Sequence, residues 1–307
     1  MFYDLIIVGG GPAGLTAALY ARRASKSALV IEKETFGGQI TFSPKVENIP
    51  GFAELSGNEF AEKLVDQVLR QGADMESATV LSVRPNPDGT KTVVTDEGDF
   101  EAKAVIIASG AKHRLLGLPG EEDWIGNGIS FCAVCDGAFY EGREVAVVGG
   151  GNSALQEAIL LSDLASRVTV VQNLDFLTGE QQLQDQLRAK SNVDILTGCV
   201  LDAYLGTDEL TGIRIRNTHD QSLSELKVDG VFLAVGLLPQ NEPFAGVLAL
   251  DERGYADADE SCKTPTEGVF VAGDCRSKRI RQVTTAAADG AVAALAACDY
   301  IDANGKK

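Results

Sequence analysis

The feature that most constrains the fold of this chain is an internal repeat. The stretch YDLIIVGGGPAGLTAALYARR at residues 3–23 returns at a constant offset as REVAVVGGGNSALQEAILLSD at residues 143–163. Each copy has a short apolar run, a glycine-rich turn and an amphipathic segment of helical period, which together form the start of a βαβ dinucleotide-binding unit. The repeat therefore predicts an α/β protein with parallel sheets and two nucleotide sites.

The first copy has the complete context of such a site. An apolar strand pattern at residues 28–31 follows the helical segment and ends at Glu32. We expect Gly9 to make the tight turn, Gly11 to let the backbone approach a pyrophosphate, and Gly14 to let helix and strand pack closely. The helix start offers N–H groups to the phosphates, and Glu32 is placed to accept hydrogen bonds from ribose hydroxyls.

The second copy predicts a second nucleotide site, with Gly149, Gly151 and Ala154 in the places of the three glycines. Two such sites in one chain suggest a flavin and a nicotinamide cofactor, with hydride passing between them. The residues expected at this second site are Gly149, Gly151, Asn152, Ser153, Ala154, Gln172 and Asn173.

The end of the next strand bears on which nicotinamide cofactor the second site takes. The residue that corresponds there to Glu32 is Gln172. A site for a 2′-phosphate needs arginines at this place, and a site for a free ribose needs an acid. Asn173 and Asp175 could bind a free ribose, whereas residues 172–178 contain no cation for a 2′-phosphate. The stretch therefore favours NADH over NADPH.

Two cysteines shortly before the second glycine turn indicate redox chemistry. Cys132 and Cys135 are separated by two residues, and Asp136 follows at once. A thiol near a helix start has a lowered pKa, and an adjacent carboxylate can move the proton that thiol–disulfide exchange requires. Asp136 could equally be a helix N-cap.

Two other interpretations of this cysteine pair remain. A structural zinc site needs about four ligands, but the chain has no second C-x-x-C pair, and its two histidines, His113 and His219, are not paired. We therefore expect no metal. Two inert core cysteines are the other alternative. The four remaining cysteines are isolated, which is not the spacing of a disulfide scaffold; they are Cys199, Cys262, Cys275 and Cys298.

Composition excludes several classes of partner. The chain has 307 residues, enough for two domains, and its 45% apolar and 23% charged residues are typical of a soluble globular protein. A formal net charge of −17 argues against nucleic acid and anionic membrane surfaces. No apolar run has the length of a membrane span, and no basic segment precedes the first strand, so we expect a cytoplasmic protein.

Apolar periodicity predicts further elements along the chain. Helices are expected at residues 59–71 and 284–297, a strand meander at 79–101, and strands at 104–108, 168–171, 231–235 and 268–274.

Taken together, the motifs resemble those of the low-molecular-weight thioredoxin reductases, which are flavin-dependent pyridine nucleotide-disulfide oxidoreductases. The matching segments lie in order along nearly the full length; they are GGGPAG (9–14), GGQ (37–39), VENIPG (46–51), CAVCDG (132–137), GGGNSA (149–154), AGD (272–274) and RQVTTAAADG (281–290). The resemblance implies two Rossmann-like three-layer domains, the second inserted into the first. An FAD-binding domain would comprise residues 1–112 and 243–307, and a pyridine-nucleotide domain with the dithiol residues 113–242.

The resemblance also implies roles for individual residues. Cys135 would be the thiol that meets the flavin, Cys132 the thiol that attacks the partner's disulfide, and Asp136 the acid–base group. The implied FAD contacts are Gly9, Gly11, Pro12, Ala13, Gly14, Glu32, Gly38, Gln39, Asn48, Ala108, Gly110, Asp274, Arg281 and Gln282. The enzyme would be a homodimer and would reduce a thioredoxin-like protein. In this family the inserted domain rotates about two hinge strands, here near Lys112–His113 and Gly236–Leu237.

One departure from the family pattern concerns the electron donor. Members that use NADPH carry a His-Arg-Arg segment, and another arginine beyond it, where this chain has Gln172-Asn173-Leu174 and Thr178. Some relatives without these arginines use NADH, and others accept electrons from ferredoxin. We expect a thioredoxin-disulfide reductase that uses NADH. The alternatives are a ferredoxin-dependent enzyme or electron-transfer flavoprotein with a vestigial nucleotide site, and a redox sensor that uses Cys132 and Cys135 as a switch.

Overall fold

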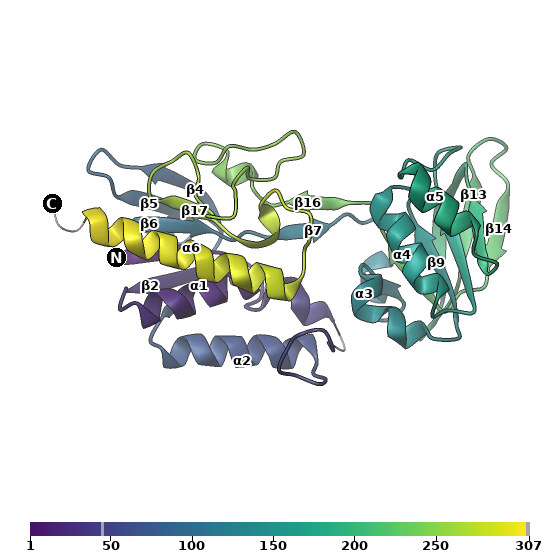
Figure 1. Cartoon of the computed structure of the whole chain (residues 1–307), viewed down its shortest axis with the longest axis horizontal. Coiled ribbons are helices and arrows are strands. Elements are labelled where there is room, and N and C mark those ends of the chain that lie inside the picture. Colours follow the sequence, from purple (N-terminus) through teal and green to yellow (C-terminus); the bar gives the residue numbers. More distant parts are fainter. Residues whose placement is uncertain (44–45, 305–307) are drawn as a thin grey trace. The chain divides into compact units, whose positions relative to one another are not determined.

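The computed structural model describes residues 1–43 and 46–304, and it divides the chain into two compact units (Figure 1). The first unit comprises Met1–Pro44, Ile49–Lys112 and Leu238–Lys307, and the second comprises Lys45–Asn48 and His113–Leu237. The chain therefore returns to the first unit at Leu238, five residues before the expected boundary between residues 242 and 243. The reason is that Asn241 is fully buried in the first unit, where its Nδ2 donates to the carbonyl oxygens of Gly254 and Cys275.

A mostly parallel sheet forms the centre of the first unit. Its strand order is β3-β2-β1-β6-β5-β4, and β17 also pairs with β6. The strands are β1 (Phe2–Val8), β2 (Ala28–Glu32), β3 (Asp74–Ser77), β4 (Val80–Pro85), β5 (Lys91–Thr95), β6 (Gly98–Ile107) and β17 (Val269–Val271). The helices are α1 (Pro12–Arg23), α2 (Gly57–Arg70) and α6 (Val283–Asn304), with short 3₁₀ turns η1 (Gly38–Phe42), η4 (Glu242–Phe244) and η5 (Gly273–Cys275).

Both faces of this sheet are buried, as the repeat predicts for a layered α/β unit. Leu5 and Ile7 of β1 pack into a cluster with α1 and α6, whereas Ile6 and Val8 point into a second cluster on the other face. Helices α1 and α6 lie side by side over the first face (Figure 1). Gly290 of α6 allows this close packing, because a Cβ at its position would lie 2.1 Å from the carbonyl oxygen of Ala13.

The second unit repeats this plan with a smaller sheet of order β11-β10-β9-β15-β8. Its strands are β8 (Ile129–Ser130), β9 (Glu144–Val148), β10 (Arg167–Val171), β11 (Val193–Leu196) and β15 (Gly230–Leu233). A second sheet consists of β12 (Cys199–Gly206), β13 (Leu210–Asn217) and β14 (Leu223–Leu226). The helical elements are α3 (Ala133–Asp136), α4 (Asn152–Ser162), α5 (Gln181–Arg188), η2 (Glu121–Trp124) and η3 (Gly137–Tyr140).

The chain passes between the units through two short strands, β7 (Ala111–His113) and β16 (Leu237–Pro239), which pair with each other. Within the part of the chain that the structure describes, no helix combines the length and the apolar character that crossing a membrane requires.

Several elements differ from those expected. The strand expected at residues 104–108 and the last strand of the meander are one continuous strand, β6. The C-terminal helix α6 extends beyond residue 297 to Asn304. Helix α5 was not expected from the apolar pattern, because Leu187 is its one fully buried residue among many glutamines.

Candidate active site

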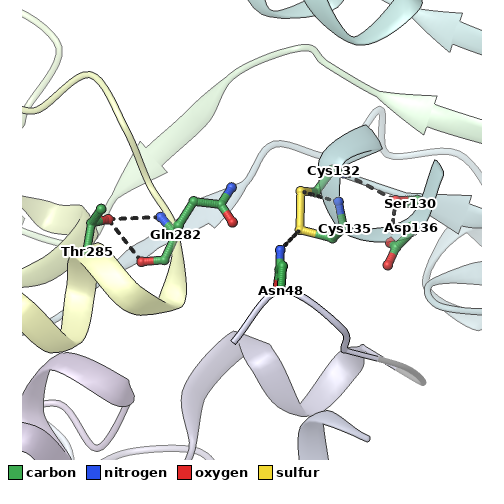
Figure 2. The surroundings of a disulfide bond; sticks show 7 residues. All are labelled: Asn48, Ser130, Cys132, Cys135, Asp136, Gln282 and Thr285. Atoms are coloured by element: carbon green, nitrogen blue, oxygen red, sulfur yellow. Dashed lines mark hydrogen bonds between the residues drawn. A yellow bond between two sulfur atoms is a disulfide. The ribbon is translucent and has the colours of Figure 1, made fainter. Parts of the chain in front are cut away.

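Cys132 and Cys135 are joined by a disulfide bond in the second unit (Figure 2). Cys132 directly precedes the short helix α3, and its Sγ accepts a hydrogen bond from the backbone N–H of Cys135 at 3.2 Å. Both cysteines are half-buried. Among the described residues no group of three or more His, Cys, Asp or Glu side chains could hold a metal ion. The two sulfur atoms of the pair are thus bonded to each other.

Asp136 stands at the end of α3, held by a buried serine. Ser130 Oγ donates to Asp136 Oδ2 at 2.6 Å and accepts from the backbone N–H of Cys132 at 3.1 Å (Figure 2). Burial raises the pKa of the Asp136 carboxyl, and the bond from Ser130 offsets this only in part. A carboxyl group with a raised pKa, fixed beside a disulfide, is suited to accept and return protons.

Asn48 belongs to the second unit, as do Cys132 and Cys135. The resemblance implies that Asn48 lies near the flavin ring, and the structure places its Nδ2 at 3.8 Å from Cys135 Sγ (Figure 2).

The sequence predicts the first nucleotide site at the glycine turn between β1 and α1. A Cβ on Gly14 would lie 1.8 Å from the carbonyl oxygen of Gly9, so helix and strand pack here without room for a side chain. A Cβ on Gly11 would meet nothing closer than 3.9 Å, so the space in front of this residue is open. Glu32 Oε2 accepts from the backbone N–H of Gly10 at 2.6 Å, which fixes the carboxylate at the turn. The structure thus brings Glu32 to the glycines, as the motif requires.

Some of the other expected flavin residues adjoin this turn, and others contact neighbouring segments of the first unit. The carbonyl of Ala108 adjoins Gly9, Gly38 adjoins Gly11, and Gln39 Nε2 donates to the carbonyl oxygen of Ala111, next to Gly110. From the C-terminal part of the chain, Gly273 adjoins Ala13, and Arg281 Nε donates to the carbonyl oxygen of Asp274 at 3.2 Å.

The residues at this turn fit an FAD. Open space at Gly11, in front of the N-terminus of α1, is what a pyrophosphate requires. Asp274 Oδ1 is buried and has no hydrogen-bond partner in the described chain, so it can accept a hydroxyl of a bound group. Burial raises the pKa of Asp274, with Lys278 and Arg281 opposing the shift. We infer that Gly11, Gly14, Glu32 and Asp274 would hold the cofactor.

A buried ion cluster fixes the turn that carries Asp274. Asp289 Oδ2 accepts from the backbone N–H of Gly273 at 3.0 Å and from Lys278 Nζ at 2.9 Å, and Asp289 Oδ1 accepts from Arg276 Nη2 at 3.0 Å. All three charged side chains are at least nine-tenths buried. Burial raises the pKa of Asp289, but its bonds to Arg276 and Lys278 outweigh burial, so the pKa lies below its ordinary value.

Replacing Asp289 by asparagine is expected to destabilise the protein by about 3 kcal/mol, because two buried cations lose their counter-ion. The pKa of Asp289 is lower in the folded protein than in the unfolded chain, so the stability that its carboxylate contributes is fully present at neutral pH. This stability is lost as the pH falls below about 4 and through the folded pKa. Urea unfolding of both proteins between pH 3 and 7 measures this. The stability difference should shrink in acid. Asp66→Asn, which removes an exposed pair with Arg70, should cost under about 0.5 kcal/mol and serves as the control.

The second glycine turn, between β9 and α4, has the same backbone plan. A Cβ on Gly151 would meet nothing closer than Thr178 Oγ1 at 3.8 Å, so this turn is also open. Gln172 is buried over Gly150, and its Nε2 donates to the carbonyl oxygen of Phe176 at 3.3 Å. Gln172 thus occupies the place of Glu32 in space as well as in sequence. Asn173, by contrast, is exposed.

Two side-chain pairs involve residues at or after this second turn. Asn152, the first residue of α4, donates from Nδ2 to Glu180 Oε1 at 2.9 Å and accepts at Oδ1 from the N–H of Glu180 at 2.7 Å. Asp175 Oδ1 lies 2.6 Å from Nε2 of His219, and both side chains are exposed. The expected ribose partner Asp175 is therefore already engaged, and a carboxylate lies at the start of α4.

Two residues near the dithiol were not assigned roles from the sequence. Ser130 lies in the stretch that precedes the cysteines, but nothing in its spacing indicates that its hydroxyl reaches Asp136. Glu157 does carry a signal, because it lies on α4 between Ala154 and Leu161, at the spacing of the buried face.

Comparison with known proteins extends over both units. A family model described as pyridine nucleotide-disulphide oxidoreductase matches residues 3–290. A Clostridium pasteurianum protein described as a 34.2 kDa protein in rubredoxin operon is 42% identical over 298 residues, which cover 97% of each chain. A thioredoxin reductase of Listeria innocua is 41% identical over 301 residues, covering 98% of this chain and 94% of that one. The crystal structure of thioredoxin reductase from Streptococcus pyogenes matches with a TM-score of 0.93 at 39% identity, covering 98% of this chain and 99% of that one.

Proposed function

We propose a function from one premise: this chain belongs to the pyridine nucleotide-disulphide oxidoreductase family. The resemblance to low-molecular-weight thioredoxin reductases is confirmed, and so is the α/β class with two Rossmann-like units. The chain is accordingly an oxidoreductase of the flavoprotein type. Its function would be to reduce the disulfide of thioredoxin or a thioredoxin-like protein. The observation that carries this proposal is the Cys132–Cys135 disulfide beside a buried carboxyl held by Ser130.

FAD, when bound at the first glycine turn, would supply the electron pair that opens the Cys132–Cys135 disulfide. Asp136 takes the thiol proton of Cys132, whose sulfur then attacks one sulfur of the partner's disulfide, and the leaving thiolate takes that proton from Asp136. Asp136 next accepts the thiol proton of Cys135, whose sulfur attacks Cys132 and expels the second partner thiolate. That thiolate takes the proton back from Asp136. Two electrons and two protons thus reach the partner, and the enzyme disulfide is restored.

For the electron donor we propose NADH in preference to NADPH. The support is the absence of Lys or Arg from residues 172–178 together with the open turn at Gly151. Anaerobic addition of each nucleotide to the purified flavoprotein, followed by flavin absorbance, tests this. NADH should bleach the flavin at a concentration at least about tenfold lower than NADPH, since a 2′-phosphate would lack a cation. Equal bleaching by both would contradict the preference.

A second candidate donor is reduced ferredoxin, and one observation favours it. The carboxylate of Glu180 is bonded to Asn152 at the start of α4, where the pyrophosphate of a nucleotide would need the helix N-terminus. A negative charge there opposes a second anion. If this pair excludes nucleotides, neither NADH nor NADPH bleaches the flavin at useful rates, while reduced ferredoxin does. Glu180→Gln would then gain a response to NADH. Asp185→Asn, which changes an exposed acid of α5, the helix that begins just after Glu180, would not.

The family also suggests a homodimer, which we propose on that ground alone. Sedimentation equilibrium of the flavin-loaded protein measures the mass directly. A single species with the mass of one 32.4 kDa polypeptide and its flavin would contradict a dimer.

A further inference from the structure

A second carboxyl group is buried near Asp136, and the mechanism above does not use it. Glu157 lies on α4, and its Oε2 is buried without a hydrogen-bond partner in the described part of the chain. Asp136 Oδ1 is likewise buried without a hydrogen-bond partner among the described residues. Buried carboxylate oxygens are normally hydrogen-bonded, so each unpartnered atom calls for an explanation.

Packing places Glu157 on the face of α4 that meets α3. Glu157, Leu160 and Leu161 are three and four residues apart and so share one face of the helix. A Cβ on Gly137, the residue after Asp136, would lie 3.3 Å from Leu161 and 3.5 Å from Leu160. Since α3 packs against α4, Glu157 lies one helical turn along the face that contacts the end of α3.

Electrostatics agrees with this placement. Burial and, as the smaller cause, the negative charge of Asp136 together raise the pKa of Glu157 to about 8. Two carboxyl groups in one poorly solvated site resist joint ionisation, so such a pair holds one proton over a wide pH range.

The other titratable groups around α4 are half-buried or exposed. Tyr140 of η3 feels the charge of Asp136, together with those of Arg143 and Asp229, and the pKa of its phenol is raised chiefly by burial. Glu144 of β9 is half-buried at its strand end; Arg167 of β10 and Asp185 and Arg188 of α5 are exposed. Asp136 is the charged group that acts on Glu157.

We propose that Glu157 carries the resting proton of this pair, so that Asp136 alone stands as the carboxylate that takes and returns thiol protons. Glu157 is a positioning residue that acts through Asp136, and this role rests on the proposed disulfide reduction. With Glu157 neutral, the pair gains its second proton when Asp136 accepts one from a cysteine thiol, and returns to one proton when the leaving thiolate takes it. If Glu157 ionises, the added negative charge makes Asp136 hold its proton and donate it poorly to the leaving thiolate.

Infrared titration of the oxidised protein tests the proton's location independently of any donor or acceptor, because the disulfide leaves neither Cys132 nor Cys135 free to titrate. The wild type should show the C=O stretch of a protonated carboxylic acid at pH 7, vanishing with a midpoint near 8. Glu157→Gln should remove this band, and Asp136→Asn should shift its midpoint downward because the neighbouring charge is gone. The exposed Glu122→Gln control should leave it unchanged. A wild type without the band, a band that persists in Glu157→Gln, or a midpoint unaffected by Asp136→Asn overturns the proposal.

The pH profile of the reduced enzyme tests the functional consequence. The rate of disulfide exchange with oxidised thioredoxin in a single turnover should fall in the wild type as pH rises through about 8. Glu157→Gln, neutral at every pH, should react at pH 7 within about twofold of the wild type and should lose that decline. A purely structural role would slow exchange by the same factor at all pH values. That result, with the infrared band intact, would remove the link to Asp136 while leaving the reductase function standing.

Discussion

Replacing Cys135 by serine is expected to lower the rate of disulfide reduction by at least about 10⁴-fold. Cys135 forms the disulfide with Cys132, and without its sulfur the mixed disulfide with the partner protein has no internal thiol to resolve it. The flavin should still be reduced by its donor, because no proposed flavin contact is changed. Stopped-flow absorbance of the flavin and single-turnover reduction of thioredoxin measure the two half-reactions separately.

A matched control is available in the same unit. Cys199 is a buried free cysteine at the start of β12, and Cys199→Ser alters one sulfur atom at a distance from the disulfide along the chain. It should retain both half-reactions within a few-fold. Continued turnover of protein disulfide by Cys135→Ser would show that the dithiol is not the reductant. Loss of both half-reactions in Cys135→Ser would indicate that the substitution damages the fold or the flavin site instead.

The parts of the fold that the sequence predicted well are those with a local cause. The strand and helix of each glycine turn, β1 with α1 and β9 with α4, are specified by contiguous apolar runs and by glycines at fixed spacing. Boundaries that depend on distant partners were predicted less well. Nothing near Asn241 in the sequence indicates that its carboxamide bonds to Gly254 and Cys275, and these bonds keep residues 238–242 in the first unit.

The same distinction applies to the site. Cys132, Cys135 and Asp136 were predicted because they are neighbours in the sequence. Two groups that surround them come from other elements: Ser130 reaches Asp136 across the end of β8, and Glu157 reaches the pair only because α4 packs on α3. The acid on the buried face of α4 was visible as a break in the apolar period. Its partner could not be identified without the packing of the two helices.

The second large effect is expected at the first glycine turn, where two similar substitutions should have opposite consequences for folding. Gly11 has φ −79° and ψ −175°, a conformation open to any residue, and its Cβ would meet no protein atom within 3.8 Å. Gly11→Ala should therefore fold but lose its flavin and all flavin-dependent activity, because the new methyl group occupies the space meant for the pyrophosphate. In Gly14→Ala the Cβ would lie 1.8 Å from the Gly9 carbonyl oxygen, so β1 and α1 must separate, at a cost of about 1–3 kcal/mol or more.

Measuring bound flavin and thermal stability together distinguishes these outcomes. Gly11→Ala should be purified without the flavin spectrum, with a far-ultraviolet circular dichroism spectrum and a melting temperature equal to those of the flavin-stripped wild type. Gly14→Ala should melt below that apoprotein. Gly151→Ala makes the same change at the same place of the second turn, where φ is −85° and ψ 178°, and it should keep its flavin in full. A Gly11→Ala protein that retains flavin would mean that the cofactor's phosphates do not approach this backbone, and the first repeat would then lose its assignment as the FAD site.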